Sequence, residues 1–82
     1  MELMDTVAMM QSEDFKERFR AEYFQTKIRR DKLAAMLVKL RAGKLDFTPK
    51  CEFWLLDQQR RQMEEYLNTL EIRAAVEEID LT

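Results

Sequence analysis

The chain's one glycine and one proline, Gly43 and Pro49, lie close together near the middle of its 82 residues. Glycine and proline are the residues that most strongly disfavour a helix, so long stretches on both sides have no strong helix breaker. Charged residues make up 37% of the chain and hydrophobic residues 46%, a mixture that favours helices over strands. The sequence therefore predicts two long helices, at about 12–42 and 49–79, joined by a turn at 43–48.

Local signals indicate where these helices begin and end. Ser12 is expected to be the N-cap of the first helix, because its hydroxyl can accept a backbone N–H. Gly43 suits the left-handed position just beyond the last turn of that helix. Thr48 followed by Pro49 is expected to begin the second helix, since proline at the first helical position leaves no N–H unpaired. The short connection predicts that the helices are antiparallel.

Apolar residues recur at helical spacing and predict which faces are buried. The main stripe of the first helix comprises Phe15, Phe19, Tyr23, Thr26, Arg30, Leu33, Leu37 and Leu40. A second, partial stripe beside it comprises Phe24, Ile28, Ala35 and Met36. Near the turn, the aromatic residues are expected to form a local core plug, with a ligand platform as the alternative; they are Phe47, Phe53 and Trp54.

These stripes are too wide to be covered by a two-helix hairpin alone, so we expect self-association into a dimer, as a four-helix bundle, or into a higher ring. The Met-rich residues 1–11 form either an N-terminal extension or a short additional helix. The predicted fold is thus all-α: one helical domain over residues 1–82, an antiparallel two-helix hairpin with a short N-terminal helical segment that self-associates into a helical bundle or ring.

Charge is distributed unevenly along the chain, although the net charge is only −2. Residues 1–15 carry a net charge of −4, residues 16–44 of +7 and residues 45–82 of −5. The simple interpretation is attraction between the two halves of the hairpin. A patch for an anionic partner is the alternative. Duplex nucleic acid is not an expected partner, because acidic residues interrupt the basic helix and the whole chain is acidic.

A polar layer interrupts the apolar stripe at Thr26 and Arg30. If the helices are aligned so that paired residue numbers sum to about 91, Arg30 lies opposite Arg61. The candidate ligand-binding residues of this layer are Tyr23, Thr26, Arg29, Arg30, Gln59, Arg60, Arg61, Gln62 and Tyr66. They could specify the pairing register, bind an anion or nucleotide through guanidinium, amide and aromatic groups, or simply be exposed to solvent.

Within the second helix, Asp57 and Arg61, Arg60 and Glu64, and Arg61 and Glu65 have the i,i+4 spacing of helical ion pairs. Arg29 and Arg30 have no acidic residue at that spacing in their own helix. If one pair in the layer has a role beyond pairing the helices, we therefore expect it to be these two arginines.

Catalysis has little support in the sequence, and we predict that the protein is not an enzyme. The chain has no histidine, and so lacks the usual base near neutral pH and the commonest metal ligand. No nucleophile motif, metal-spaced cluster or glycine-rich phosphate loop is present, and we expect neither a metal nor a cofactor. The single Cys51 is expected to have a packing or incidental role.

No run of residues approaches the length of about 20 apolar residues that crosses a bilayer, and the first residues lack the basic region of a signal peptide. A cytoplasmic location, without a membrane partner, is the expectation.

The chain also resembles a family of short helical-hairpin proteins of tailed phages and prophages, named after a crAss-like phage gene product. The resemblance covers about residues 15–75. The residues that carry it are Glu22, Tyr23, Lys32, Leu33, Met36, Leu37, Leu55, Leu56, Gln59, Met63, Tyr66, Leu67, Leu70 and Arg73. It implies the hairpin fold and a phage protein acting in the bacterial host cell, and it implies no particular role.

In that context the best hypothesis is counter-defence, in which an oligomer sequesters an anionic nucleotide immune signal in the polar layer. A second hypothesis is a protein interaction module that inhibits a host protein through the stripe of Phe24, Ile28, Ala35 and Met36. The third is an accessory structural protein of the phage.

Overall fold

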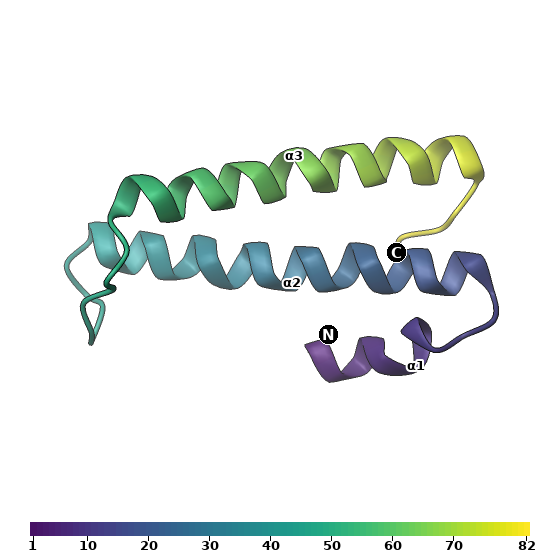
Figure 1. Ribbon diagram of the computed structural model, residues 1–82, viewed down its shortest axis with the longest axis horizontal. Coiled ribbons are helices and arrows are strands. Elements are labelled where there is room, and N and C mark those ends of the chain that lie inside the picture. The colour runs from purple at the N-terminus through teal and green to yellow at the C-terminus, as the bar shows by residue number, and fades with distance from the viewer.

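The computed structural model describes residues 1–82, and all of its regular secondary structure is helical, with no strands. A 3₁₀ helix η1, Leu3–Thr6, continues into the short helix α1, Val7–Met10, and two long helices follow, α2, Phe15–Arg41, and α3, Phe53–Glu77. α3 runs back along one side of α2, and η1 and α1 lie along the other side (Figure 1). The predicted all-α fold, the antiparallel hairpin and the short N-terminal helix are confirmed.

The beginning of α2 differs from the prediction by a few residues. Asp14 is the N-cap, because its Oδ1 accepts a hydrogen bond from the Lys16 backbone N–H at 2.9 Å. The Ser12 hydroxyl instead accepts from the Asp14 N–H at 3.0 Å. Ser12 was therefore wrong as the cap, since its oxygen is bonded in the turn that precedes the helix.

The end of α2 agrees with the sequence. Gly43 has φ +71°, the left-handed conformation that a residue with a Cβ rarely adopts. Its N–H donates to the Leu40 carbonyl at 3.2 Å, and the Lys44 N–H donates to the Lys39 carbonyl at 2.8 Å. These two bonds form a Schellman motif, which satisfies carbonyls that the end of a helix leaves without partners.

Two polar contacts between the long helices fix their register. The Tyr23 hydroxyl donates to Glu71 Oε2 at 2.8 Å, and the Arg30 guanidinium donates to Glu64 Oε1 at 2.5 Å. The two contacts lie seven residues apart on each helix, and the paired numbers sum to 94 in both cases. The predicted alignment near 91, with Arg30 opposite Arg61, was wrong by three residues.

This register explains why α3 does not begin at Pro49. Arg41, in the last turn of α2, lies over the Phe53 ring, with its Cζ 5.5 Å from the ring centroid. A helix that began at Pro49 would extend beyond the end of α2 and have no partner to pack against. The predicted start at Thr48 and Pro49 was therefore wrong. Residues 42–52 form the connecting loop, and Glu52 is the N-cap of α3.

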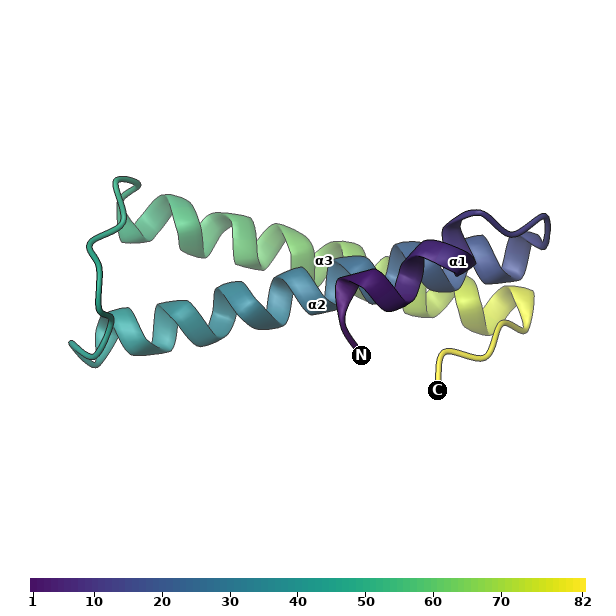
Figure 2. The same ribbon diagram turned by 90° about the horizontal axis from the view of Figure 1, so that it is seen from below.

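The hydrophobic core lies at the end of the hairpin away from this loop. Its buried residues are Phe19, Tyr23, Leu67, Leu70, Ala74 and Ile79. Beyond α3 the chain turns back toward α2, where Lys16 Nζ donates to the Glu78 carbonyl at 3.3 Å and Arg20 Nε to the Asp80 carbonyl at 2.7 Å. Seen from below, α2 and α3 separate toward the loop (Figure 2), and in that half only Leu37 is buried.

The N-terminal segment is held on α2 by polar contacts. Thr6 is completely buried, and its hydroxyl donates to the Leu3 carbonyl at 2.7 Å while accepting from the Gln25 side-chain amide at 2.9 Å. Glu2 lies 4.0 Å from Lys32. Residues 1–11 are thus a third helical layer of the structure.

Neither long helix contains an apolar stretch of the length and character that crosses a bilayer.

Gly43, just after α2, and Glu78, just after α3, both have a positive φ. Substitutions at these two positions test the left-handed helix ends. Gly43→Ala should lower the free energy of unfolding by about 1 kcal/mol, because a Cβ is unfavourable at positive φ. Apart from Gly43 and its two chain neighbours, no atom lies within 4 Å of the position of that Cβ, so backbone strain is the only expected cause. Glu78, at φ +58°, provides the control, since Glu78→Gly should cause no loss. Urea denaturation of both variants measures the difference, and an equal loss in both would contradict this account.

Candidate functional site

The structure does not gather the nine predicted layer residues into one cluster. Tyr23 is buried, while Thr26, Arg30 and Arg60 are half-buried. The other five are exposed: Arg29, Gln59, Arg61, Gln62 and Tyr66. The register provides the reason, because Arg30 lies opposite Glu64 and not opposite Arg61.

Arg30 forms two ion pairs within the fold. Its Nε donates to Asp31 Oδ1 at 2.7 Å, in addition to the bond to Glu64. Burial disfavours the charged guanidinium, but the hydrogen bonds to both carboxylates outweigh this effect, and the pKa of Arg30 is raised. In the fold, Arg30 helps to fix the register of the two helices, which was the first of the three interpretations of the polar layer. As the sequence indicated, Arg30 has no acidic residue at i,i+4 spacing in its own helix; its partners are the adjacent Asp31 and, on the other helix, Glu64.

The neighbouring polar residues also have structural partners. The Thr26 hydroxyl donates to the Glu22 carbonyl at 2.9 Å, one turn earlier in the same helix. The Tyr23 hydroxyl is bonded to Glu71. Burial, followed by the hydrogen bond and the charge of Glu71, raises the pKa of Tyr23 to about 12.

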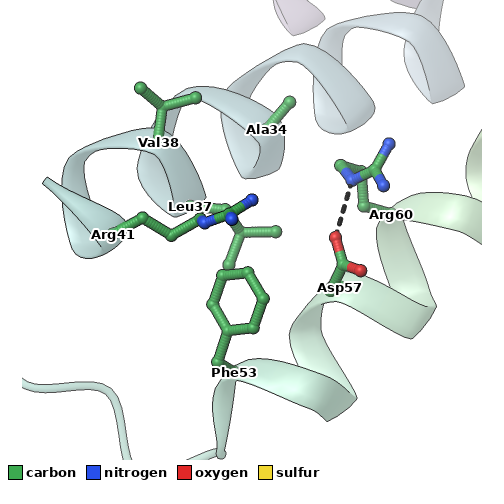
Figure 3. A pocket seen from close by; sticks show the side chains of 7 residues that line it. All are labelled: Ala34, Leu37, Val38, Arg41, Phe53, Asp57 and Arg60. Carbon is green, nitrogen blue, oxygen red and sulfur yellow. Dashed lines mark hydrogen bonds and ion pairs between the residues drawn. The ribbon is translucent and has the colours of Figure 1, made fainter.

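A pocket of about 260 Å³ lies between the two helices in the loop half of the hairpin. Figure 3 shows its lining residues, which come from consecutive turns of each helix. α2 supplies Ala34, Leu37, Val38 and Arg41, and α3 supplies Phe53, Asp57 and Arg60. Their spacings of three and four residues place each set on one helix face. Of these seven, only Arg60 was among the predicted site residues.

The pocket combines an aromatic ring, a buried aliphatic side chain and two guanidinium groups. Arg41 stacks over Phe53 and forms no ion pair. Arg60 lies 3.0 Å from Asp57 and 3.7 Å from Glu64, so it is largely neutralised. Aromatic faces bind flat rings and guanidinium forks bind anionic oxygens. The pocket therefore offers both groups that a ligand with a ring and a phosphate needs.

The aromatic residues near the loop do not form the predicted core plug. Phe47, Phe53 and Trp54 are all exposed, because α2 and α3 separate toward the loop and leave this end thinly covered. The alternative, a ligand platform, agrees with the position of Phe53 in the pocket wall. The sequence feature that indicates the α3 wall of the pocket is the spacing of Phe53, Asp57 and Arg60, which places them on one helix face.

Two of the three i,i+4 ion pairs expected in α3 are present. Asp57 lies 3.5 Å from Arg61, and Arg60 lies 3.7 Å from Glu64. Arg61 forms no ion pair with Glu65. Asp57 thus pairs with Arg60 and Arg61 of its own helix and forms no hydrogen bond or ion pair with α2.

The predicted partner stripe on α2 is partly covered. Phe24 packs against the core, Ile28 and Met36 are half-buried, and Ala35 is exposed. Cys51 is exposed in the loop, and no group of three or more Cys, Asp or Glu side chains is close enough to hold a metal ion.

One family model, described as Sequestin, matches residues 13–76. The chain belongs to the Sequestin family. The matched range contains α2, nearly all of α3 and every residue of the pocket, whereas η1 and α1 lie outside it. No curated protein and no solved structure matches the chain. The Sequestin match gives no information on biological origin, so the phage context stays a prediction.

The buried Tyr23 of this Sequestin chain predicts a loss of stability in alkali. Its pKa is about 12 in the folded state and about 10 when unfolded, so below pH 10 its contribution is fully present. As pH rises from 10 toward 12, only the unfolded chain releases the proton, and the free energy of unfolding should fall by about 1.4 kcal/mol per pH unit. Denaturation across this range should show the slope, reduced in Tyr23→Phe.

The exposed Tyr66 provides the control for this measurement. Tyr66→Phe should keep the wild-type dependence on pH, because that phenol is exposed in the folded chain. An identical alkaline slope in wild type and Tyr23→Phe would contradict the assignment.

Proposed function

We propose that this protein is a non-enzymatic binding protein that sequesters a small anionic nucleotide in the pocket of the hairpin. The observation that carries the proposal is the pairing of Phe53 with Arg41, an arginine that forms no ion pair and lies at the pocket wall. The family name, Sequestin, is compatible with a sequestering, binding role.

The geometry of the pocket suggests how such a ligand is held. A nucleobase stacks on Phe53 in the position that the Arg41 guanidinium occupies in the free protein, and Leu37 forms an apolar floor. Arg41, once displaced, turns its donors toward the phosphate, and Arg60 can add a second donor from the opposite wall. A volume of about 260 Å³ is slightly below the range of about 300–1,000 Å³ that is usual for small-molecule sites. It suits part of a nucleotide rather than a larger ligand.

The biological role follows from mass action if the predicted phage context holds. A protein that binds a host immune nucleotide lowers its free concentration in the bacterial cytoplasm without any chemical step. The dissociation constant of the complex must then be lower than the concentration at which the signal acts. The protein must also be present in amounts comparable to the signal. The proposed role is therefore counter-defence by stoichiometric sequestration.

Calorimetry with a panel of cyclic and linear nucleotides tests the site. For a nucleotide that binds, Arg41→Ala should weaken binding by about tenfold to a hundredfold, since a hydrogen bond to a charged group contributes about 1.5–3 kcal/mol. Phe53→Ala should have a similar effect through lost stacking. Arg29→Ala is the matched control, because Arg29 is an exposed arginine of the same helix outside the pocket.

Analysis of the bound nucleotide tests whether the protein leaves it chemically unchanged. After heat release from the complex, chromatography should recover the nucleotide intact and in the bound amount. Recovery of a modified product in catalytic excess over protein would refute the non-enzymatic proposal. Absence of heat with every nucleotide, or equal weakening by Arg29→Ala and Arg41→Ala, would refute the pocket as the site.

A further inference from the structure

Apolar side chains are exposed to solvent at the loop end of the hairpin. We propose that a second copy of this chain docks there, in a two-fold dimer that covers the mouth of the pocket. Only the occupation of the covered pocket by a ligand rests on the proposed function.

The exposed area is larger than expected for a monomer. Folded monomers of this mass expose about 5,200 Å², whereas this chain exposes 6043 Å². The excess is close to the area of about 800 Å² that each partner buries in a stable protein interface. The elongated shape, 43 × 24 × 19 Å, leaves this area open, and a second hairpin packed alongside would remove it.

Five of the twelve large exposed hydrophobic side chains lie where the helices separate, and four others lie within residues 1–15. Within residues 38–55 the large exposed ones are Val38, Phe47, Phe53, Trp54 and Leu55. Val38 is 67% exposed and Trp54 59%. Exposed apolar patches of this kind are typical of protein interfaces. At the opposite end of α3, Ile72 and Val76 are also exposed, but charged residues adjoin them in the sequence, namely Glu71, Arg73 and Glu77.

Charge complementarity selects a second copy as the occupant. The segment that contains α2 carries a net charge of +7 over residues 16–44, and the segment that contains α3 carries −5 over residues 45–82. A two-fold axis places each patch against the same patch of the partner. The basic α2 of one copy can then lie beside the acidic α3 of the other, so that basic and acidic helices alternate in a four-helix bundle.

The second copy would also complete the pocket. Val38 and Phe53 form its walls, yet Val38 is mostly exposed and Phe53 is 36% exposed. Small-molecule sites usually bury most of the ligand surface, which this open pocket does not do alone. An apolar surface from the partner across Val38 and Phe53 would exclude water from the site.

Light scattering of nucleotide-free protein measures the docking independently of any ligand. Wild type should have a mass of about 20 kDa, twice the 9.9 kDa of the chain, and Val38→Glu and Trp54→Glu should each have the mass of one chain. Ile72→Glu is the control, since Ile72 is 66% exposed on the same helix as Trp54 but at its other end. It should retain the dimer mass. Circular dichroism reports whether each variant is folded.

The outcomes separate this inference from the proposed function. A wild-type mass of one chain at high protein concentration overturns the dimer, and so does dimer mass retained in both Val38→Glu and Trp54→Glu. Loss of the dimer in Ile72→Glu as well overturns the location of the surface, and a mass above two chains overturns the two-fold arrangement. A dimer that binds no nucleotide supports the docking and refutes the proposed function alone.

Discussion

The structure depends on the two polar contacts that join α2 to α3, between Tyr23 and Glu71 and between Arg30 and Glu64. Apolar side chains can pack in several alignments at similar cost, because their attraction has no direction. A hydrogen-bonded pair is different, since a slip would leave a partly buried guanidinium and a buried phenol without acceptors, and each such loss is costly. Two contacts seven residues apart therefore permit one alignment of the helices.

That alignment also creates the pocket. One further step of seven residues along each helix brings Leu37 level with Asp57, and here no polar contact crosses between the helices. Asp57 pairs instead with Arg60 and Arg61 of its own helix, at 3.0 and 3.5 Å. Leu37 remains as a buried apolar floor. The pocket thus occupies the position at which a third polar contact between the helices would lie, and both Leu37 and Asp57 line it.

Much of the fold was predictable because its signals are local. Gly43 ends α2 through its own backbone conformation, and the spacing of the apolar stripe predicted the burial of Phe19, Tyr23 and Leu37. The register was not predictable from the turn, because Thr48 and Pro49 resemble a helix start but have no helix to pack against at that position. The role of Arg30 was open for the same reason, since its partner Glu64 is found only when the register is known.

The pocket is where sequence reasoning was weakest, and the physical cause is the uneven core. Phe19, Tyr23 and Leu70 are buried at one end, whereas the loop end has few buried contacts. Regions with few buried contacts open at low free energy, so a ligand held there by a single hairpin must also supply the cost of ordering the two helices. A partner packed across the loop end would order the two helices before the ligand binds, so that more of the interaction energy would contribute to affinity. Tight sequestration by so small a hairpin is therefore easiest to understand if the helices are held together at both ends, by the core at one and by a second copy at the other.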